Sequence, residues 1–201
     1  MIRQPRNWNE VQEFTEQAKL PLDAYVCKVI RAEVQGEQLC VAFDITEGAQ
    51  TGFYKRAFAT DNRDNKKWKG VLRLWLPKDD GSEKDEWTKS IFKGMVTSFE
   101  KSNPGYKWNW DETSLSGRMI GIMFRNEEWE YEGKTGWAVR PFRAMSVDTV
   151  RSGDYTLPKD KPLKNKATSG YGESYDSFAA PSNSYSSDFA MLDDDDAQLL
   201  F

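Results

Sequence analysis

The feature that most constrains the fold is a two-residue alternation of apolar and polar side chains. It is clearest in LCVAFDI (39–45) and in VLRLWLP (71–77). Successive side chains of a strand point to opposite faces, so each segment predicts a strand with one face in the core. The same reading applies to YVCKVIRAE (25–33), to RMIGIMF with its continuation EEWEYE, and to WAVRPFRAMSV. The chain is therefore expected to form a mainly β domain.

One long segment departs from this pattern. In TKSIFKGMVTSFE (88–100) the apolar residues recur at helical spacing, and the SNPG that follows is a helix stop. FYKRAF (53–58) is interpreted as part of a strand, and GKTG as the turn of a final hairpin. This order indicates an OB-fold-like five-stranded barrel with one helix between strands 3 and 4. A further short helix is predicted over residues 9–19, with Asn9 as its N-cap.

The composition changes near residue 155. The later residues are rich in Ser, Gly and Tyr and have no periodicity, which is typical of disorder. Seven of the 32 acidic residues follow Lys166 and none of the 28 basic residues does, so the preceding body carries a net charge of +3. We predict a binding domain over 1–154, a disordered linker over 155–192 and an acidic segment over 193–201.

Several function classes are disfavoured by composition. The chain has no histidine, which removes imidazole bases and histidine metal ligands, and its two cysteines are too few for a four-thiolate zinc site. A GxxxxGK[ST] phosphate loop is also absent. We expect no catalytic residue, metal or cofactor. Without a run of about 18 apolar residues or a secretory signal, we expect a cytoplasmic protein that does not associate with membranes.

Aromatic residues interleaved with cations are the strongest candidates for a binding surface. In VLRLWLP the leucines occupy one face, and Arg73 and Trp75 share the other. Rings stack on the bases of single-stranded nucleic acid while cations contact its phosphates. The plainer alternative is that such residues cover the edge of a core. The candidate DNA-binding residues are Tyr54, Arg56, Lys66, Lys67, Trp68, Lys69, Arg73, Trp75, Arg140 and Phe142.

Two other aromatic groups are weaker candidates. Trp108 and Trp110 lie in a predicted loop, which we interpret as a plug over one end of the barrel. Trp129 and Tyr131 share one face of a predicted strand whose other face carries glutamates. Glutamates repel phosphate, so nucleic acid is expected to avoid that hairpin or to use its opposite side.

The last residues combine four aspartates with an apolar LLF. The aspartates would steer toward a basic partner, and the apolar residues would anchor in a pocket. In this respect the chain resembles the single-stranded DNA-binding proteins of bacteria and phages, in which an OB-fold body and a disordered linker precede an acidic tip. That resemblance implies docking of replication or recombination proteins by Asp193, Asp194, Asp195, Asp196, Leu199, Leu200 and Phe201.

The likeness has limits within the tip. The bacterial tip places Ile-Pro before the Phe, whereas this chain has AQLL before Phe201. In the body, DITEG, LWLP, SNPGYKWNWDE and EWEYEGKTGW resemble a phage or mobile-element family of Gram-positive bacteria.

These observations predict a non-enzymatic, homo-oligomeric protein that binds single-stranded DNA without sequence specificity, in replication, recombination or repair. The main alternative is a protein-interaction adaptor that uses the acidic segment as a tether and binds no nucleic acid. A carbohydrate-binding domain and a metal-dependent nuclease are further alternatives. Steep loss of oligonucleotide affinity with rising salt would separate the first prediction from the adaptor.

Overall fold

The computed structural model describes residues 3–6, 8–10 and 19–163. The chain divides into two units, Met1–Asn165 and Lys166–Phe201, and the second lies outside the described residues. So do residues 11–18, which form most of the predicted helix over 9–19. In chain order the elements are η1 (Trp8–Glu10), β1 (Ala24–Gln35), β2 (Gln38–Ile45), α1 (Phe53–Ala59), β3 (Val71–Trp75), α2 (Glu83–Ser102), η2 (Glu112–Leu115), β4 (Met119–Tyr131), β5 (Lys134–Met145) and α3 (Val147–Ser152).

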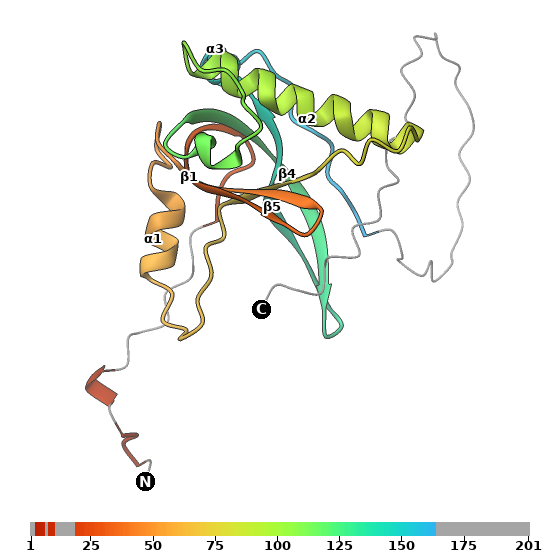
Figure 1. Ribbon diagram of the computed structural model, residues 1–201. Coiled ribbons are helices and arrows are strands. Elements are labelled where there is room, and N and C mark those ends of the chain that lie inside the picture. Colours follow the sequence, from red (N-terminus) through yellow and green to blue (C-terminus); the bar gives the residue numbers. More distant parts are fainter. Residues whose placement is uncertain (1–2, 7, 11–18, 164–201) are drawn as a thin grey trace, which may run out of the picture. The chain divides into compact units, whose positions relative to one another are not determined.

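The five strands form one antiparallel sheet in the order β3-β2-β1-β4-β5 (Figure 1). This confirms the predicted mainly β domain with its long helix between the third and fourth strands. The edge strands β3 and β5 approach each other, with Cα pairs within 8 Å. No hydrogen-bonded ladder joins them among the described residues, so the sheet is open at this point.

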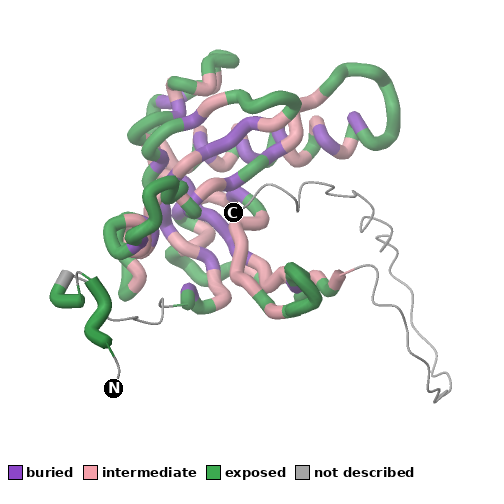
Figure 2. The backbone as a smooth tube through the Cα atoms, turned by 90° about the horizontal axis from the view of Figure 1, so that it is seen from below, coloured by how far each residue is buried: buried purple, intermediate pink, exposed green. Residues whose placement is uncertain are grey.

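The predicted alternation is confirmed in β2 and β3. The apolar residues of β2, from Leu39 to Ile45 in steps of two, are buried, and so are Leu72 and Leu74 of β3. Buried positions follow the strands and recur on the inner side of α2 (Figure 2). There Phe92, Met95 and Phe99 complete the core.

The expectation that FYKRAF continues a strand is wrong, because these residues form α1. Gly52 adopts φ 70°, a left-handed conformation that glycine accepts readily, and redirects the chain after β2. The Asp44 carboxylate of β2 then accepts hydrogen bonds from the backbone N–H groups of Tyr54 (3.0 Å) and Lys55 (3.2 Å). These donors of the first turn have no partner within the helix, so a residue ten positions earlier supplies the cap.

The long helix α2 begins five residues before the predicted start and ends two residues after the predicted end. Ser82 is its N-cap and accepts a hydrogen bond from Asp85 N–H at 3.1 Å. The first turn also carries Glu83 and Glu86, which the positive end of the helix dipole favours. The helix start was missed because the prediction followed apolar residues at helical spacing, and the first turn of α2 is charged.

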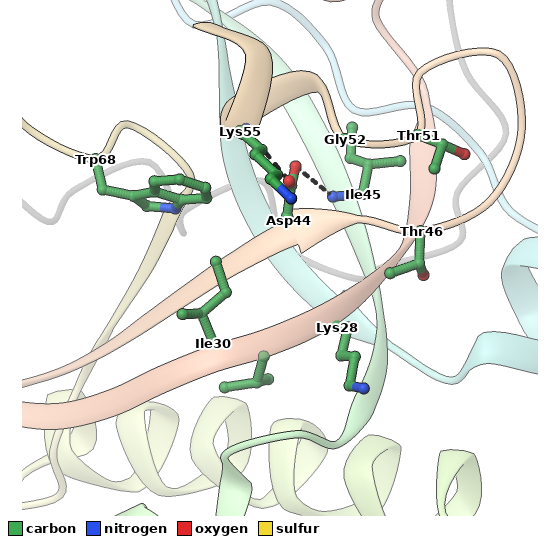
Figure 3. A pocket seen from close by; sticks show the side chains of 10 residues that line it. Lys28, Ile30, Asp44, Ile45, Thr46, Thr51, Gly52, Lys55 and Trp68 are labelled. Carbon is green, nitrogen blue, oxygen red and sulfur yellow. Dashed lines mark hydrogen bonds between the residues drawn. The ribbon is translucent and has the colours of Figure 1, made fainter. Parts of the chain in front are cut away.

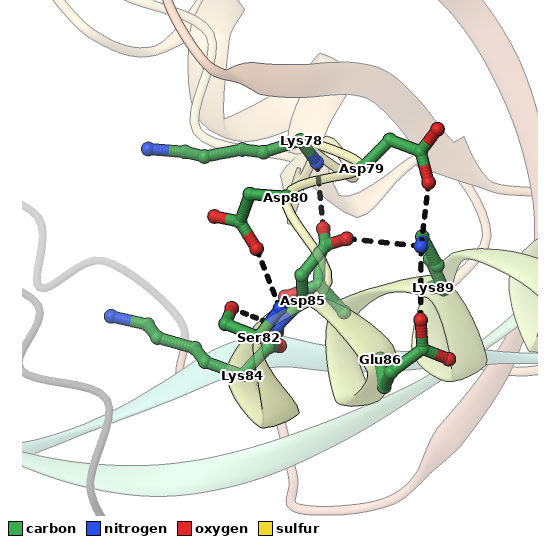
Figure 4. A network of polar contacts seen from close by, with 9 residues as sticks. Lys78, Asp79, Asp80, Ser82, Lys84, Asp85, Glu86 and Lys89 are labelled. Atoms are coloured by element: carbon green, nitrogen blue, oxygen red, sulfur yellow. Dashed lines mark hydrogen bonds and ion pairs between the residues drawn. The ribbon is translucent and has the colours of Figure 1, made fainter.

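A polar network fixes this helix start (Figure 4). The buried carboxylate of Asp85 accepts from Lys78 N–H at 2.7 Å and pairs with the Lys89 ammonium at 3.1 Å. Burial acts to raise the pKa of Asp85, but these contacts outweigh it and the pKa is lowered. Lys89 also contacts Asp79 (2.7 Å) and Glu86 (3.0 Å), so its own pKa is raised.

The chain after α3 returns to the sheet. The Tyr155 hydroxyl donates to Asp23 at 2.5 Å, and Lys161 N–H donates to Asn126 O at 2.9 Å. Leu163 N–H donates to the Glu128 carboxylate at 3.2 Å. Residues 155–163, which we predicted as the start of the linker, therefore contact β4 and the residue before β1. The rest of the predicted linker lies outside the described residues.

Candidate functional site

The outward face of β1, β2 and β3 gathers several of the predicted binding residues. In the ladder between β2 and β3, Arg73 lies opposite Cys40 and Trp75 lies opposite Gln38. Both side chains point away from Leu72 and Leu74, as predicted from the alternation. Arg73 is exposed and Trp75 is half-buried.

A hollow lies on the same face, where β1 and β2 meet α1 (Figure 3). Trp68 and Ile30 supply apolar surface to it, and Asp44 lies next to Lys55 of α1. The ammonium-bearing side chains of Lys28 and Lys55 also line it. The hollow therefore combines an aromatic ring, an aliphatic side chain, two cations and one carboxylate.

Trp68 is held in one orientation. Its indole N–H donates to Phe43 O at 3.0 Å and to Gly70 O at 3.2 Å. Its ring packs near Tyr54 and Phe58, with centroids 6.5 and 5.7 Å away. A Cβ at position 70 would lie 2.6 Å from Phe43 O and from the Tyr54 ring, so only glycine permits this packing. A ring fixed in this way loses little freedom when a ligand stacks on it.

The loop before β3 adds cations beside Trp68. Lys66, Lys67 and Lys69 are all exposed, as a phosphate-binding role requires. The Lys66 ammonium lies 4.8 Å from the centre of the Phe58 ring.

Two predicted residues are placed differently from expectation. Tyr54 is only 6% exposed and packs against Phe43 in the core, so its ring does not offer a face to a base. Burial of its hydroxyl raises the pKa of Tyr54. Arg56 is exposed on α1, but its guanidinium donates to the backbone carbonyl of Thr51. Because the segment is a helix, Tyr54 and Arg56 do not share a face as they would on a strand.

Arg140 and Phe142 belong to a second region, on the β4–β5 hairpin. Arg140 lies directly opposite Arg125 in the ladder. The Phe142 ring has the Arg125 guanidinium 4.1 Å and the Arg143 guanidinium 5.3 Å from its centre. Arg125 also pairs with Glu127 at 2.5 Å.

Trp129 and Tyr131 lie on the same face of this hairpin as Arg125 and are exposed. The Trp129 ring covers Gly136, where a Cβ would lie 2.7 Å from the indole. The expected repulsion by glutamates concerns the other face, where Glu128 is buried and accepts from Leu163 N–H.

Helix α3 packs against β4 and β1. A Cβ at Gly121 of β4 would meet Val150 of α3 at 2.5 Å and Ser146 O at 2.9 Å. The Arg151 guanidinium of α3 pairs with Glu47, just after β2, at 2.5 Å. The predicted residues thus lie on two strand pairs: Arg73 and Trp75 on β3 beside β2, and Arg140 and Phe142 on β5 beside β4.

The loop after α2 is partly as predicted. Trp108 packs against the core, whereas Trp110 is 78% exposed with its ring parallel to Phe92 at 6.4 Å. The acidic segment from Asp193 to Phe201 lies outside the described residues.

The sequence prediction missed Lys28, Ile30 and Lys55. Lys28 could have been found, because its neighbours Cys27 and Val29 are apolar and a strand would turn Lys28 outward. Ile30 follows the same alternation and is exposed like Lys28, but its apolar side chain gave no reason to place it outside the core. Lys55 reaches the hollow only because its segment is helical.

Comparison with known proteins adds no assignment: no protein-family model and no curated protein matches the chain. Within the described ranges, no helix is both long and apolar enough to cross a membrane. Among the same residues, no three Cys, Asp or Glu side chains are grouped so as to hold a metal ion.

Proposed function

We propose that this protein binds single-stranded DNA without strong sequence specificity, through the outward face of β1, β2 and β3, and acts without catalysis. The observation that carries the proposal is the fixed Trp68 ring in a hollow that Lys28 and Lys55 also line, with Arg73 and Trp75 further along the same sheet face. Rings stack on bases of any identity, and lysines and arginines neutralise phosphates, so this combination suits a strand of varied sequence.

The sheet order supports an OB-like fold for this domain. Pairing of β3 with β5, which already approach each other, would close the order β3-β2-β1-β4-β5 into a five-stranded barrel. OB-folds bind oligonucleotides on the face formed by strands 2 and 3 and with the loops of the first and last hairpins. Trp75 and Arg73 lie on that face.

The proposal extends to the cellular role. The resemblance to phage and bacterial single-stranded DNA-binding proteins favours replication, recombination or repair in a bacterial or phage-infected cytoplasm. We propose that the acidic segment 193–201 recruits partner proteins of those processes, and that the protein works as a homo-oligomer, because one barrel offers only a short track for DNA.

The test is a titration followed by intrinsic tryptophan fluorescence. Oligo-dT should quench the emission at low salt, quenching should weaken as salt rises, and duplex of equal length should quench little. The Trp110→Ala variant should behave like the wild type, because Trp110 lies in the loop after α2. Absence of quenching and of any mobility shift at low salt would overturn the proposal in favour of the protein-interaction adaptor.

A further inference from the structure

The hollow of Figure 3 contains a carboxylate on a face proposed to meet phosphates, which is an electrostatic cost. Among the described residues, neither the Lys28 nor the Lys55 ammonium forms an ion pair that would neutralise Asp44. Both ammonium groups therefore remain available to phosphates. The carboxylate is instead open to a neutral hydrogen-bond donor.

Asp44 is a rigid acceptor with unused capacity. Its Oδ1 accepts from Ile45 N–H at 2.9 Å and from Tyr54 N–H at 3.0 Å, and its Oδ2 accepts from Lys55 N–H at 3.2 Å. A carboxylate offers about four acceptor positions. One position on Oδ2 thus remains beyond these three contacts, and three backbone donors hold the group in place.

Flat apolar surface lies beside this acceptor. The Trp68 ring is fixed by its two indole hydrogen bonds, and Ile30 is 50% exposed at the irregularity of β1. A planar ring that stacks on Trp68 and contacts Ile30 would bring its hydrogen-bonding edge toward Asp44. A nucleobase has both the flat face and the polar edge that this arrangement requires.

We infer that the hollow takes one base of the bound strand and that Asp44 accepts a hydrogen bond from its exocyclic amine. This inference rests on the proposed function. Cytosine carries such an amine at N4, and carboxylates are established acceptors for it. Thymine has a carbonyl oxygen at the same position, so two acceptors would face each other. The protein then binds any single strand but favours cytosine over thymine at this position.

The first experiment uses wild-type protein and three oligonucleotides of equal length in a competition assay by fluorescence anisotropy. These are oligo-dC, oligo-dT and an oligonucleotide of 2-pyrimidinone, which differs from cytosine only by lacking the amine. Oligo-dC should bind about fivefold or more tighter than the 2-pyrimidinone strand, because a charge-assisted hydrogen bond is lost. Equal affinity for those two strands would overturn the inference and leave the proposed function intact.

Two variants locate the effect. Asp44→Asn keeps an oxygen that caps α1 but loses the second acceptor oxygen. In this variant the ratio of oligo-dC affinity to oligo-dT affinity should fall to within about twofold of the wild-type ratio of 2-pyrimidinone affinity to oligo-dT affinity. Glu33→Gln is the matched control, because Glu33 lies on the same face of β1, outside the hollow, paired with Arg31 at 3.2 Å. It removes the same charge and should keep the wild-type ratio.

The outcomes separate the two proposals. An unchanged ratio in Asp44→Asn overturns the assignment of Asp44. Failure of every strand to bind the wild type overturns the proposed function itself. If thermal melting shows that Asp44→Asn is unfolded, the wild-type comparison with 2-pyrimidinone decides the question alone.

Discussion

The outward face of β1–β3 and the β4–β5 hairpin have the same kinds of side chain and differ in how these are engaged. On the hairpin, Arg125 and Arg143 both lie within cation–π distance of Phe142, and Arg125 is also paired with Glu127. On the β1–β3 face, the Trp68 indole N–H donates to the backbone carbonyl of Phe43, and Lys28 and Lys55 line the hollow beside the ring. Aromatic and cationic side chains therefore indicate a binding surface only where the rings and the cations are held in place without interacting with each other.

The largest expected effect is the difference in DNA affinity between two variants that each remove one ring, one from the β1–β3 face and one from the β4–β5 hairpin. Trp75→Ala should weaken oligo-dT binding by about 5- to 150-fold, because base stacking contributes roughly 1–3 kcal/mol. Phe142→Ala should change affinity by less than about twofold, since its ring already stacks with arginines. Anisotropy titration of both folded variants measures this, and an equal loss in both would remove the distinction between the regions.

A charge comparison should follow in size. The double variant Lys28→Gln/Lys55→Gln should make the plot of log affinity against log salt less steep by about 1.4. Each phosphate contact on a single strand contributes roughly 0.7 to the magnitude of that negative slope. Arg140→Gln on the hairpin should leave the slope nearly unchanged. The slopes come from titrations at four or more salt concentrations; a larger change for Arg140→Gln would assign the phosphate track to the hairpin.

Stability of the hairpin should be separable from binding. Gly136→Ala places a Cβ 2.7 Å from the Trp129 indole, which must shift. We expect a loss of about 1–3 kcal/mol in the free energy of unfolding, with oligo-dT affinity unchanged. Chemical denaturation with a parallel titration checks both, and Gly133→Asn, at a turn with φ 73° that asparagine tolerates, is the mild control.

The smallest effect concerns the contact between α3 and the end of β2. The Arg151 guanidinium lowers the pKa of Glu47 below its ordinary 4.5 through their hydrogen bond. The contribution of this pair to stability is therefore full above pH 4.5 and is lost as the pH falls through the lowered pKa. Glu47→Gln should lower Tm by no more than about 2 °C at pH 7, because the pair is exposed.

The pH dependence provides the check on that prediction. Thermal melts of wild type and Glu47→Gln should differ at pH 7, and the difference should shrink as the pH falls below 4.5 through the lowered pKa of Glu47. A difference that stays constant as the pH falls would show that the variant acts through something other than the ion pair.

Strand alternation was enough to predict the burial of Leu72 and Leu74 and the outward placement of Arg73 and Trp75, because period two fixes the face of each residue. It failed at FYKRAF, which forms α1. The deciding interaction there is the capping of the first turn of α1 by the Asp44 carboxylate of β2. Local sequence does not encode that contact. The placement of Trp75 and Phe142 on different strand pairs also could not be predicted, because it depends on the strand order of the sheet.

Burial of Tyr54 shows the same limit for the candidate site. Its aromatic ring and neighbouring cations matched the binding pattern, but packing against Phe43 places it in the core. Ile30 was missed for the complementary reason: alternation places it outward beside Lys28, but an apolar side chain indicates a core position.

The most direct measurement is photo-crosslinking of wild-type protein to an oligonucleotide that carries 5-iodouracil, followed by mass spectrometry of the modified peptides. We expect crosslinks at Trp68 and Trp75 on the outward face of β1–β3. Crosslinks confined to Trp129, Tyr131 and Phe142 on the β4–β5 hairpin, or to Trp110, would contradict it.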